Sequence, residues 1–213
     1  SGGVAVCPAT EHHAVLEVVE HHGGVVVGVD HAGRVDLGQL APALDEIVAA
    51  DRSVAIVSVM TVNNEVGSIN DLEAVRRVVR RHSPGALLHT DAVQAPCWLD
   101  LRRVTPHVDL LALSAHKFGG PKGVGVLVEN GGPKINPLII GGGQERERRS
   151  GTHNTAGIVA ASIALELTDA ERATEVVRIA ALRDRLVDEL CTRLNGVTET
   201  LDRSEKVAGS GHV

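Results

Sequence analysis

Short runs rich in Val, Ile and Leu alternate along this chain with longer stretches whose apolar residues recur at helical spacing. The run Ser53–Val59 is almost continuously apolar, which is typical of a strand buried on both faces of a sheet. Strands that alternate with helices indicate βαβ units, so the sequence predicts an α/β fold with a mostly parallel central sheet flanked by helices. The other expected strands are Val4–Cys7, Val25–Val29, Ala86–His89, Leu110–Leu113 and Val124–Val128, and the expected helices are His12–His22, Leu40–Ala50, Asp71–His82, Thr155–Leu167 and about Glu175–Leu194.

The composition excludes several classes of function. Trp98 and Phe118 are the two aromatic residues of the Phe, Tyr and Trp class, so the stacking platforms of single-stranded nucleic-acid binders are lacking. The net charge of −6 argues against a partner with a phosphate backbone. Three cysteines without a CxxC pair exclude a disulfide framework and a zinc knuckle, and they favour a reducing, cytoplasmic compartment. The most apolar helix, around residues 156–167, is too short to span a membrane, so we expect neither a membrane nor a nucleic acid as partner.

Polar side chains follow three of the predicted strands, at the point where each strand ends. Because the carboxyl ends of parallel strands meet at one edge of a sheet, where ligands bind in open α/β folds, we expect these side chains on one rim. They are Asn64 after Ser53–Met60, Asp91 and Gln94 after Ala86–His89, and Ser114, His116 and Lys117 after Leu110–Leu113.

The chemistry of this set matches pyridoxal phosphate. A partly buried lysine that loses its proton can form a Schiff base with a carbonyl group. An aspartate on a neighbouring strand can keep a pyridine nitrogen protonated, while a hydroxyl and an imidazole suit a phosphate and two amides suit a phenolic oxygen. Taken singly, Lys117 is better explained as a solvated lysine and Asp91 as a capping residue. The coincidence at three strand ends favours the cofactor site.

Several longer motifs resemble those of the cysteine desulfurases, which belong to the class V aminotransferase family and have the fold type I architecture of pyridoxal phosphate enzymes. The resemblance covers almost the whole chain, in the family's order and approximate spacing. It is carried by Thr10–Val15 (TEHHAV), Val62–Gly67 (VNNEVG), His89–Gln94 (HTDAVQ), Ser114–Gly125 (SAHKFGGPKGVG), Gly141–Arg146 (GGGQER) and Arg149–Thr152 (RSGT).

This resemblance implies a role for each matching residue. Lys117 would bind the cofactor covalently and later carry the proton at the substrate α-carbon, and Asp91 would pair with the pyridine nitrogen. His12 would stack on the ring, and Ser114 and His116 would bind the phosphate. The remaining contacts would come from Asn64 and Gln94 on the oxygen side of the ring, with Asn64 also near the substrate carboxylate, and from Thr152, which would reach the phosphate of the other subunit of a homodimer.

The expected reaction converts L-cysteine to L-alanine and leaves the sulfur as a persulfide on an enzyme cysteine. Such sulfur would pass to an acceptor protein, a scaffold for iron–sulfur clusters or a component of tRNA thiolation. Two alternatives stay open. One is a selenocysteine lyase or another class V lyase or aminotransferase. The other is a non-catalytic domain of the same fold that only dimerises, although such a domain would be expected to lose Lys117 or Asp91, and both are present.

Two departures from the family pattern point to a fragment of a longer protein that would be inactive by itself. An N-terminal phosphate loop is missing, and so is the C-terminal small domain with the catalytic cysteine. We therefore assign residues 1–170 to the cofactor-binding large domain and residues 171–213 to a long helix and the start of the small domain. None of the cysteines lies in a matching segment: Cys7 is expected in a buried strand, Cys97 is expected to be the most exposed, and Cys191 is expected to be packed on the side of Val187.

The Glu-His-His triplets at Glu11–His13 and Glu20–His22 invite a metal-binding interpretation. Nine residues of helix give a rise of about 13.5 Å and half a revolution, so the two triplets would face opposite ways. A metal site needs ligands that converge at about 2 Å. We therefore predict no metal, and surface positions for these histidines except the stacking residue His12.

Overall fold

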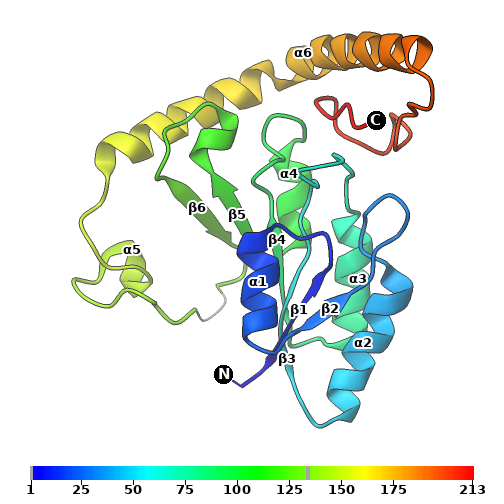
Figure 1. The fold of residues 1–213 in the computed structure, drawn as a ribbon. Coiled ribbons are helices and arrows are strands. Elements are labelled where there is room, and N and C mark those ends of the chain that lie inside the picture. Colours follow the sequence, from blue (N-terminus) through cyan, green and yellow to red (C-terminus); the bar gives the residue numbers. More distant parts are fainter. Residues whose placement is uncertain (1, 133–134) are drawn as a thin grey trace.

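The chain folds around a six-stranded sheet that confirms the predicted α/β class (Figure 1). The computed structural model describes residues 2–132 and 135–213. The strands run in the order β2-β1-β3-β4-β5-β6, with every pair parallel except β5 and β6. The strands are β1 (Val4–Pro8), β2 (Val25–Val27), β3 (Val54–Ser58), β4 (Leu87–Asp91), β5 (Leu110–Ser114) and β6 (Gly125–Glu129).

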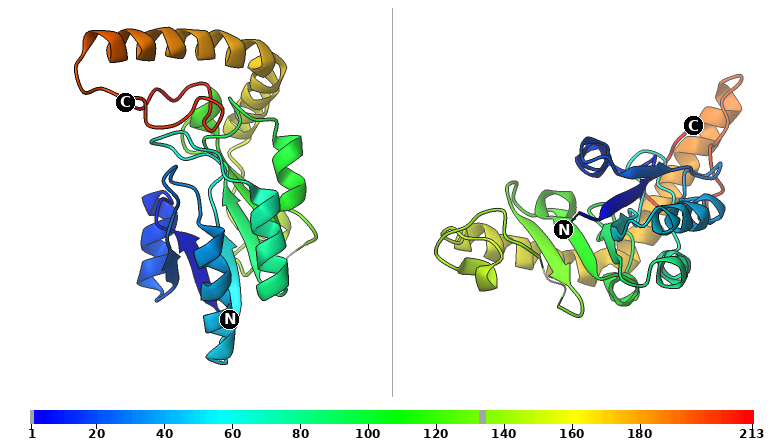
Figure 2. Two further views of the ribbon diagram at one scale, coloured as in Figure 1. Left: turned by 90° about the vertical axis from the view of Figure 1, so that its right-hand side faces the viewer. Right: turned by 90° about the horizontal axis from the view of Figure 1, so that it is seen from below.

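Helices cover the two faces of the sheet unequally (Figure 2). Helix α1 (His13–His21) lies on one face, and α2 (Leu37–Ala49) and α3 (Leu72–His82) lie on the other. Aspartates cap the latter two helices: Asp36 accepts the N–H of Gly38 at 2.8 Å and Asp71 accepts that of Ala74 at 2.9 Å. The short elements that sequence patterns did not predict are α4 (Leu101–Val104), α5 (Gln144–Glu147) and the 3₁₀ turns η1 (Thr105–His107) and η2 (Ala115–Phe118).

The strand order reverses at β1, which is flanked by β2 on one side and β3 on the other. The chain leaves β1 through α1 on one face and leaves β3 through α3 on the opposite face, so the loops after β1 and β3 diverge at their carboxyl ends. Such a switch point opens a crevice where ligands bind in open α/β sheets. The polar strand ends predicted from the sequence lie at this same edge.

The core is aliphatic, as the scarcity of aromatic residues predicts. Leu40 and Leu44 of α2, Val79 of α3 and Leu88 of β4 are fully buried. In β4 burial alternates along the strand, with Leu88 and Thr90 inside and Leu87, His89 and Asp91 half-buried on the face that α1 covers only in part. The more open face therefore carries the polar residues of the strand.

The expectation of two separate helices at the C-terminal side is wrong. A single helix, α6 (Thr155–Arg193), runs for 39 residues without interruption. The intervening residues 168–174 are polar but contain neither Gly nor Pro, and an ion pair between Asp169 and Arg172 spans one helical turn there. The low apolar content of this stretch reflects its exposure to solvent and not a break in the helix. The helix also continues through residue 170, where we expected a domain boundary.

Helix α6 crosses the molecule at the end of the sheet where the strand-following loops lie (Figures 1 and 2). Thr168 donates to the carbonyl of Phe118 at 3.1 Å, and Arg172 donates to that of Pro96 at 2.9 Å. The segment after α6 folds back under it, where buried Arg183 donates to the carbonyls of Val207 and Ser210. Among the described residues no helix is long and apolar enough to cross a membrane.

Candidate functional site

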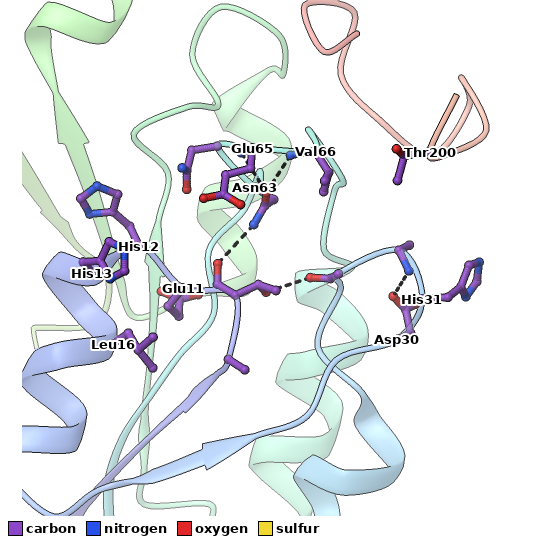
Figure 3. Close-up of a pocket in the computed structure, with 15 residues that line it drawn as sticks. Glu11, His12, His13, Leu16, Asp30, His31, Asn63, Glu65, Val66 and Thr200 are labelled. Carbon is purple, nitrogen blue, oxygen red and sulfur yellow. Dashed lines mark hydrogen bonds between the residues drawn. The ribbon is translucent and has the colours of Figure 1, made fainter. Parts of the chain in front are cut away.

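The loop after β1 brings His12 to the rim of a pocket of about 390 Å³ at the switch point (Figure 3). His12 is the N-cap of α1: its Nδ1 accepts the N–H of Ala14 at 3.1 Å, and its exposed ring lies outside the helix proper. The hydroxyl of Thr10 donates to the carbonyl of Gly33 at 2.8 Å and fixes this loop against the one after β2. His12 is thus held by its backbone while its ring faces solvent.

Two neighbouring asparagines after β3 have different roles. Asn63 is buried and works as scaffold: its Nδ2 donates to the carbonyl of Thr10 at 3.2 Å, and its Oδ1 accepts the N–H groups of Glu65 and Val66 (Figure 3). Asn64 is exposed and lines the pocket. The rigid turn built by Asn63 leaves Asn64, the residue singled out from the sequence, free for a ligand.

Asp91 ends β4 on the open face of the sheet. One carboxylate oxygen accepts the N–H of Val93 at 2.9 Å, which fixes the turn that leads to half-buried Gln94. No Lys, Arg or His side chain in residues 2–132 and 135–213 forms an ion pair with Asp91. A half-buried carboxylate without a protein cation suits a cationic ligand group.

The third strand end places Ser114, His116 and Lys117 together. Ser114 closes β5, and its hydroxyl lies 2.8 Å from Nδ1 of His116. Lys117 follows in η2, with an exposed side chain and with its carbonyl accepting the Cys97 thiol at 3.4 Å. Gly119 has a φ of 83°, a conformation that favours glycine, and turns the chain back into β6. The register pairs Asp91 with Ala112, two residues before Ser114, so both groups stand on adjacent strands at one edge.

Thr152 lies apart from this cluster. It is exposed and belongs to the segment between α5 and α6. Within the part of the chain that the structure describes, Thr152 makes no hydrogen bond to any of the other predicted site residues. The structure therefore places Asp91 and Ser114 at the ends of adjacent strands, with His116 and Lys117 directly after Ser114. His12 and Asn64 line the pocket formed by the loops after β1 and β3, and Thr152 is exposed.

Sequence analysis missed two polar residues beneath this edge, Glu11 and His89. Glu11, which the sequence analysis considered only as part of a Glu-His-His triplet, is 5% exposed and contacts Met60 and Ser58 of the third strand segment. Burial raises its pKa to about 8, with Asp91 adding to the rise, and burial lowers the pKa of His89. The sequence does hold a signal for these two residues. Glu11 follows an apolar strand and His89 lies within one, and polar residues at such places indicate a buried polar group.

The expected exposures of the cysteines need correction. Cys7 is buried in β1 as predicted, and burial beside Glu11 raises the pKa of its thiol to about 12. Cys97 is only half-buried rather than the most exposed, and burial raises its pKa as well. Cys191 is exposed rather than packed, because the end of α6 extends past the sheet and only the strip around Val187 is covered. Raised pKa values make Cys7 and Cys97 poor nucleophiles.

The described residues contain no group of three or more His, Cys, Asp or Glu side chains that could hold a metal ion. The donor set at the strand ends has a different character: one lone carboxylate, a hydroxyl–imidazole pair, two amides and an exposed amine. These groups fit pyridoxal phosphate, which offers a pyridine nitrogen, a phosphate, a phenolic oxygen and an aldehyde.

Comparisons with known proteins agree with this chemistry. The family model described as Aminotransferase class-V matches residues 1–207. A cysteine desulfurase of Gluconacetobacter diazotrophicus is 38% identical over 214 residues, which cover 98% of this chain and 52% of the relative. The chain thus spans about half the length of this curated relative.

Solved structures share the fold. The structure of a NifS-like protein has a TM-score of 0.85 at 36% identity and covers 97% of this chain and 56% of its own. The structure of SspA in complex with cysteine has a TM-score of 0.65 at 30% identity, covering 78% of this chain and 48% of its own. The carboxyl edge described above therefore belongs to an architecture that recurs in proteins similar to this one.

Proposed function

Because the chain belongs to the class-V aminotransferase family, which implies pyridoxal phosphate as cofactor, we propose that it forms the cofactor-binding part of a cysteine desulfurase. The observation that carries the proposal is a pair of adjacent strand ends at one edge of the sheet: β4 ends at Asp91, and β5 ends at Ser114 and is followed by His116 and Lys117. The similarity to curated cysteine desulfurases supports L-cysteine as substrate. The similar SspA structure, which is a complex with cysteine, is consistent with the same substrate.

Each residue at the edge would hold one part of the cofactor. The carboxylate of Asp91 would pair with the ring nitrogen, and the Ser114–His116 pair, already joined at 2.8 Å, would bind the phosphate. Asn64 and Gln94 would contact the oxygen side of the ring. His12, fixed by its own cap hydrogen bond, would cover the face of the ring.

Lys117 would act at two stages, first by holding the cofactor and then by moving a proton at the substrate α-carbon. Lys117 is exposed on a 3₁₀ turn, and its carbonyl accepts the Cys97 thiol, which leaves the amine available for both tasks. The cofactor, when bound, supplies an electron sink for the α-carbon. Asp91 strengthens that sink because its negative charge favours the protonated ring nitrogen.

We also propose that the protein forms a homodimer in the cytoplasm. The sulfur of L-cysteine would leave as a persulfide on a cysteine outside this chain and would then pass to an acceptor protein. Exposed apolar residues on β6 and α6 support a covered surface there: Leu127 is 49% exposed and Ile163 is 51% exposed. Thr152, exposed in the segment between α5 and α6, would then reach the phosphate of the partner subunit. Free cysteines are consistent with a reducing compartment.

The proposal is tested by titrating the chain with pyridoxal phosphate and then adding L-cysteine. We expect absorbance near 400 nm, a round value on the order expected for the bound cofactor, and a change of that absorbance with L-cysteine. Lys117→Ala should abolish the absorbance, whereas Lys122→Ala, at an exposed lysine in the following turn, should keep it. A borohydride-stable adduct that survives Lys117→Ala would overturn the proposal.

A further inference from the structure

A carboxyl group is buried beneath the candidate site with no cationic partner among the described residues. Glu11 lies in the loop between β1 and α1, directly before His12. One of its oxygens accepts the N–H of Met60, and the other lies 3.5 Å from the hydroxyl of Ser58. Buried carboxylates are normally paired with a cation, and burial without one penalises the charged form, so the position of Glu11 favours the protonated acid.

The contacts of Glu11 continue across two strands. The hydroxyl of Ser58, at the end of β3, lies 2.8 Å from Nδ1 of His89 in β4. Ser58 and His89 are direct partners in the register of the two parallel strands. His89 precedes Asp91 by two residues, so both side chains stand on the same face of β4. A chain of three polar groups thus leads from the loop beside His12 to the neighbour of Asp91.

Burial and the negative charge of Asp91 on β4 raise the pKa of Glu11 and favour its neutral form, whereas the hydrogen bonds from Met60 and Ser58 oppose the rise. Other titratable groups nearby are Cys7 on β1, His89 on β4 and His12 in its own loop. Cys7 stays protonated at neutral pH, and Asp91 opposes a second negative charge. Burial also keeps His89 neutral, although Asp91 acts in the opposite direction. All three members of the chain are therefore uncharged near pH 7.

The direction of the hydrogen bonds depends on the proton of Glu11. A protonated Glu11 donates to Ser58, whose hydroxyl then donates to Nδ1 of His89 and leaves the imidazole proton on Nε2. An ionised Glu11 accepts from Ser58 instead, and Ser58 then accepts a proton held on Nδ1 of His89. The proton of Glu11 thereby selects the tautomer of His89. A neutral Glu11 also carries no negative charge that would stabilise a cationic His89.

We propose that Glu11 is a positioning residue: through Ser58 it holds the proton of neutral His89 on Nε2, so that His89 presents one fixed tautomer beside Asp91, where Asp91 would meet the ring nitrogen of the cofactor. The tautomer of His89 is a property of the chain alone, whereas the benefit to Asp91 rests on the proposed function. The two parts can therefore fail separately.

The tautomer is measured by ¹⁵N nuclear magnetic resonance on the histidine-labelled chain without cofactor. At pH 7 we expect neutral His89 with its proton on Nε2. As Glu11 ionises above about pH 8, we expect the proton of His89 to move to Nδ1. Glu11→Gln keeps a neutral donor and should hold the Nε2 tautomer at every pH, whereas Ser58→Ala should remove the preference. Glu17→Gln, at an exposed glutamate of α1, should behave as wild type.

A charged His89 at pH 7, or the same response to pH in wild type and Glu11→Gln, would overturn the tautomer proposal whether or not the cofactor binds. The effect on Asp91 is read from the dissociation constant of pyridoxal phosphate between pH 7 and 9. The affinity of wild type for pyridoxal phosphate should fall by about tenfold over this range, the equivalent of one pKa unit of interaction. The affinity of Glu11→Gln should fall less. Equal weakening of both would overturn the link to Asp91, and a failure of both to bind would refute the proposed function instead.

Discussion

The two faces of the sheet contrast in how they are completed. On the α2–α3 face, Leu44, Val79 and Leu88 are fully buried and the packing is closed. On the other face α1 covers only the first strands, polar groups end β3, β4 and β5, and Leu127 of β6 is half exposed. The closed face supplies the free energy of folding, and the open face supplies chemistry and surfaces for other chain segments.

The largest effect expected on the open face is that of Asp91→Asn. Removing the carboxylate leaves the closed face intact but weakens the pairing with the ring nitrogen. The rate at which L-cysteine changes the cofactor absorbance should fall on the order of 10³-fold, a barrier increase of about 4 kcal/mol. Stopped-flow absorbance measures this rate, with circular dichroism as the control for folding. A variant as fast as wild type would show that Asp91 has no such role.

Matched leucine truncations compare the stability of the faces directly. Leu44→Ala removes a fully buried side chain of α2 and should cost about 2–5 kcal/mol of unfolding free energy. Leu127→Ala removes a half-exposed side chain of β6 and should cost less than about 1 kcal/mol in the isolated chain. Urea denaturation measures both. Equal losses would mean that β6 is covered in solution.

Glu11 gives the open face a pH dependence of stability. The folded state raises the pKa of this group from 4.5 to about 8, so folded Glu11 retains a proton that the unfolded chain releases. Its contribution is complete below pH 4.5 and is lost as pH rises to about 8, at about 1.4 kcal/mol per pKa unit. His89 acts oppositely, because its lowered pKa disfavours the folded state below pH 6.5.

The difference between wild type and Glu11→Gln isolates the carboxyl group from His89. We take the unfolding free energy of Glu11→Gln minus that of wild type. This difference should be larger at pH 8 than at pH 5, by up to about 4 kcal/mol. Urea denaturation at both pH values provides the comparison. A difference that does not depend on pH would refute the raised pKa of Glu11.

The smallest effect is expected from the cysteines. The 213-residue chain should release no sulfide from L-cysteine, because burial raises the thiol pKa values of Cys7 and Cys97, and Cys191 lies on the far end of α6. The sulfide signal should therefore stay at background in the wild-type chain and in the variants Cys7→Ala, Cys97→Ala and Cys191→Ala. Turnover that vanishes in one of these variants would identify a nucleophile inside this chain.

The sequence predicts the strand ends well because hydrophobic runs and the polar residues after them are local features. It does not distinguish the scaffold residue Asn63 from the exposed Asn64, since that depends on a hydrogen bond to Thr10 in another loop. The Glu11–Ser58–His89 chain was likewise invisible, because it follows from the register between β3 and β4. The continuity of α6 was missed because a solvated helical stretch lacks the apolar periodicity that marks a helix.

The covalent partner of the cofactor tests the central claim most directly. The chain is incubated with pyridoxal phosphate, reduced with borohydride and digested, and the modified peptide is identified by mass spectrometry. The account predicts a stable adduct on Lys117, its loss in Lys117→Ala, and its persistence in Lys122→Ala. An adduct on another lysine in the wild-type chain, or one unchanged by Lys117→Ala, would contradict the assignment of this edge of the sheet.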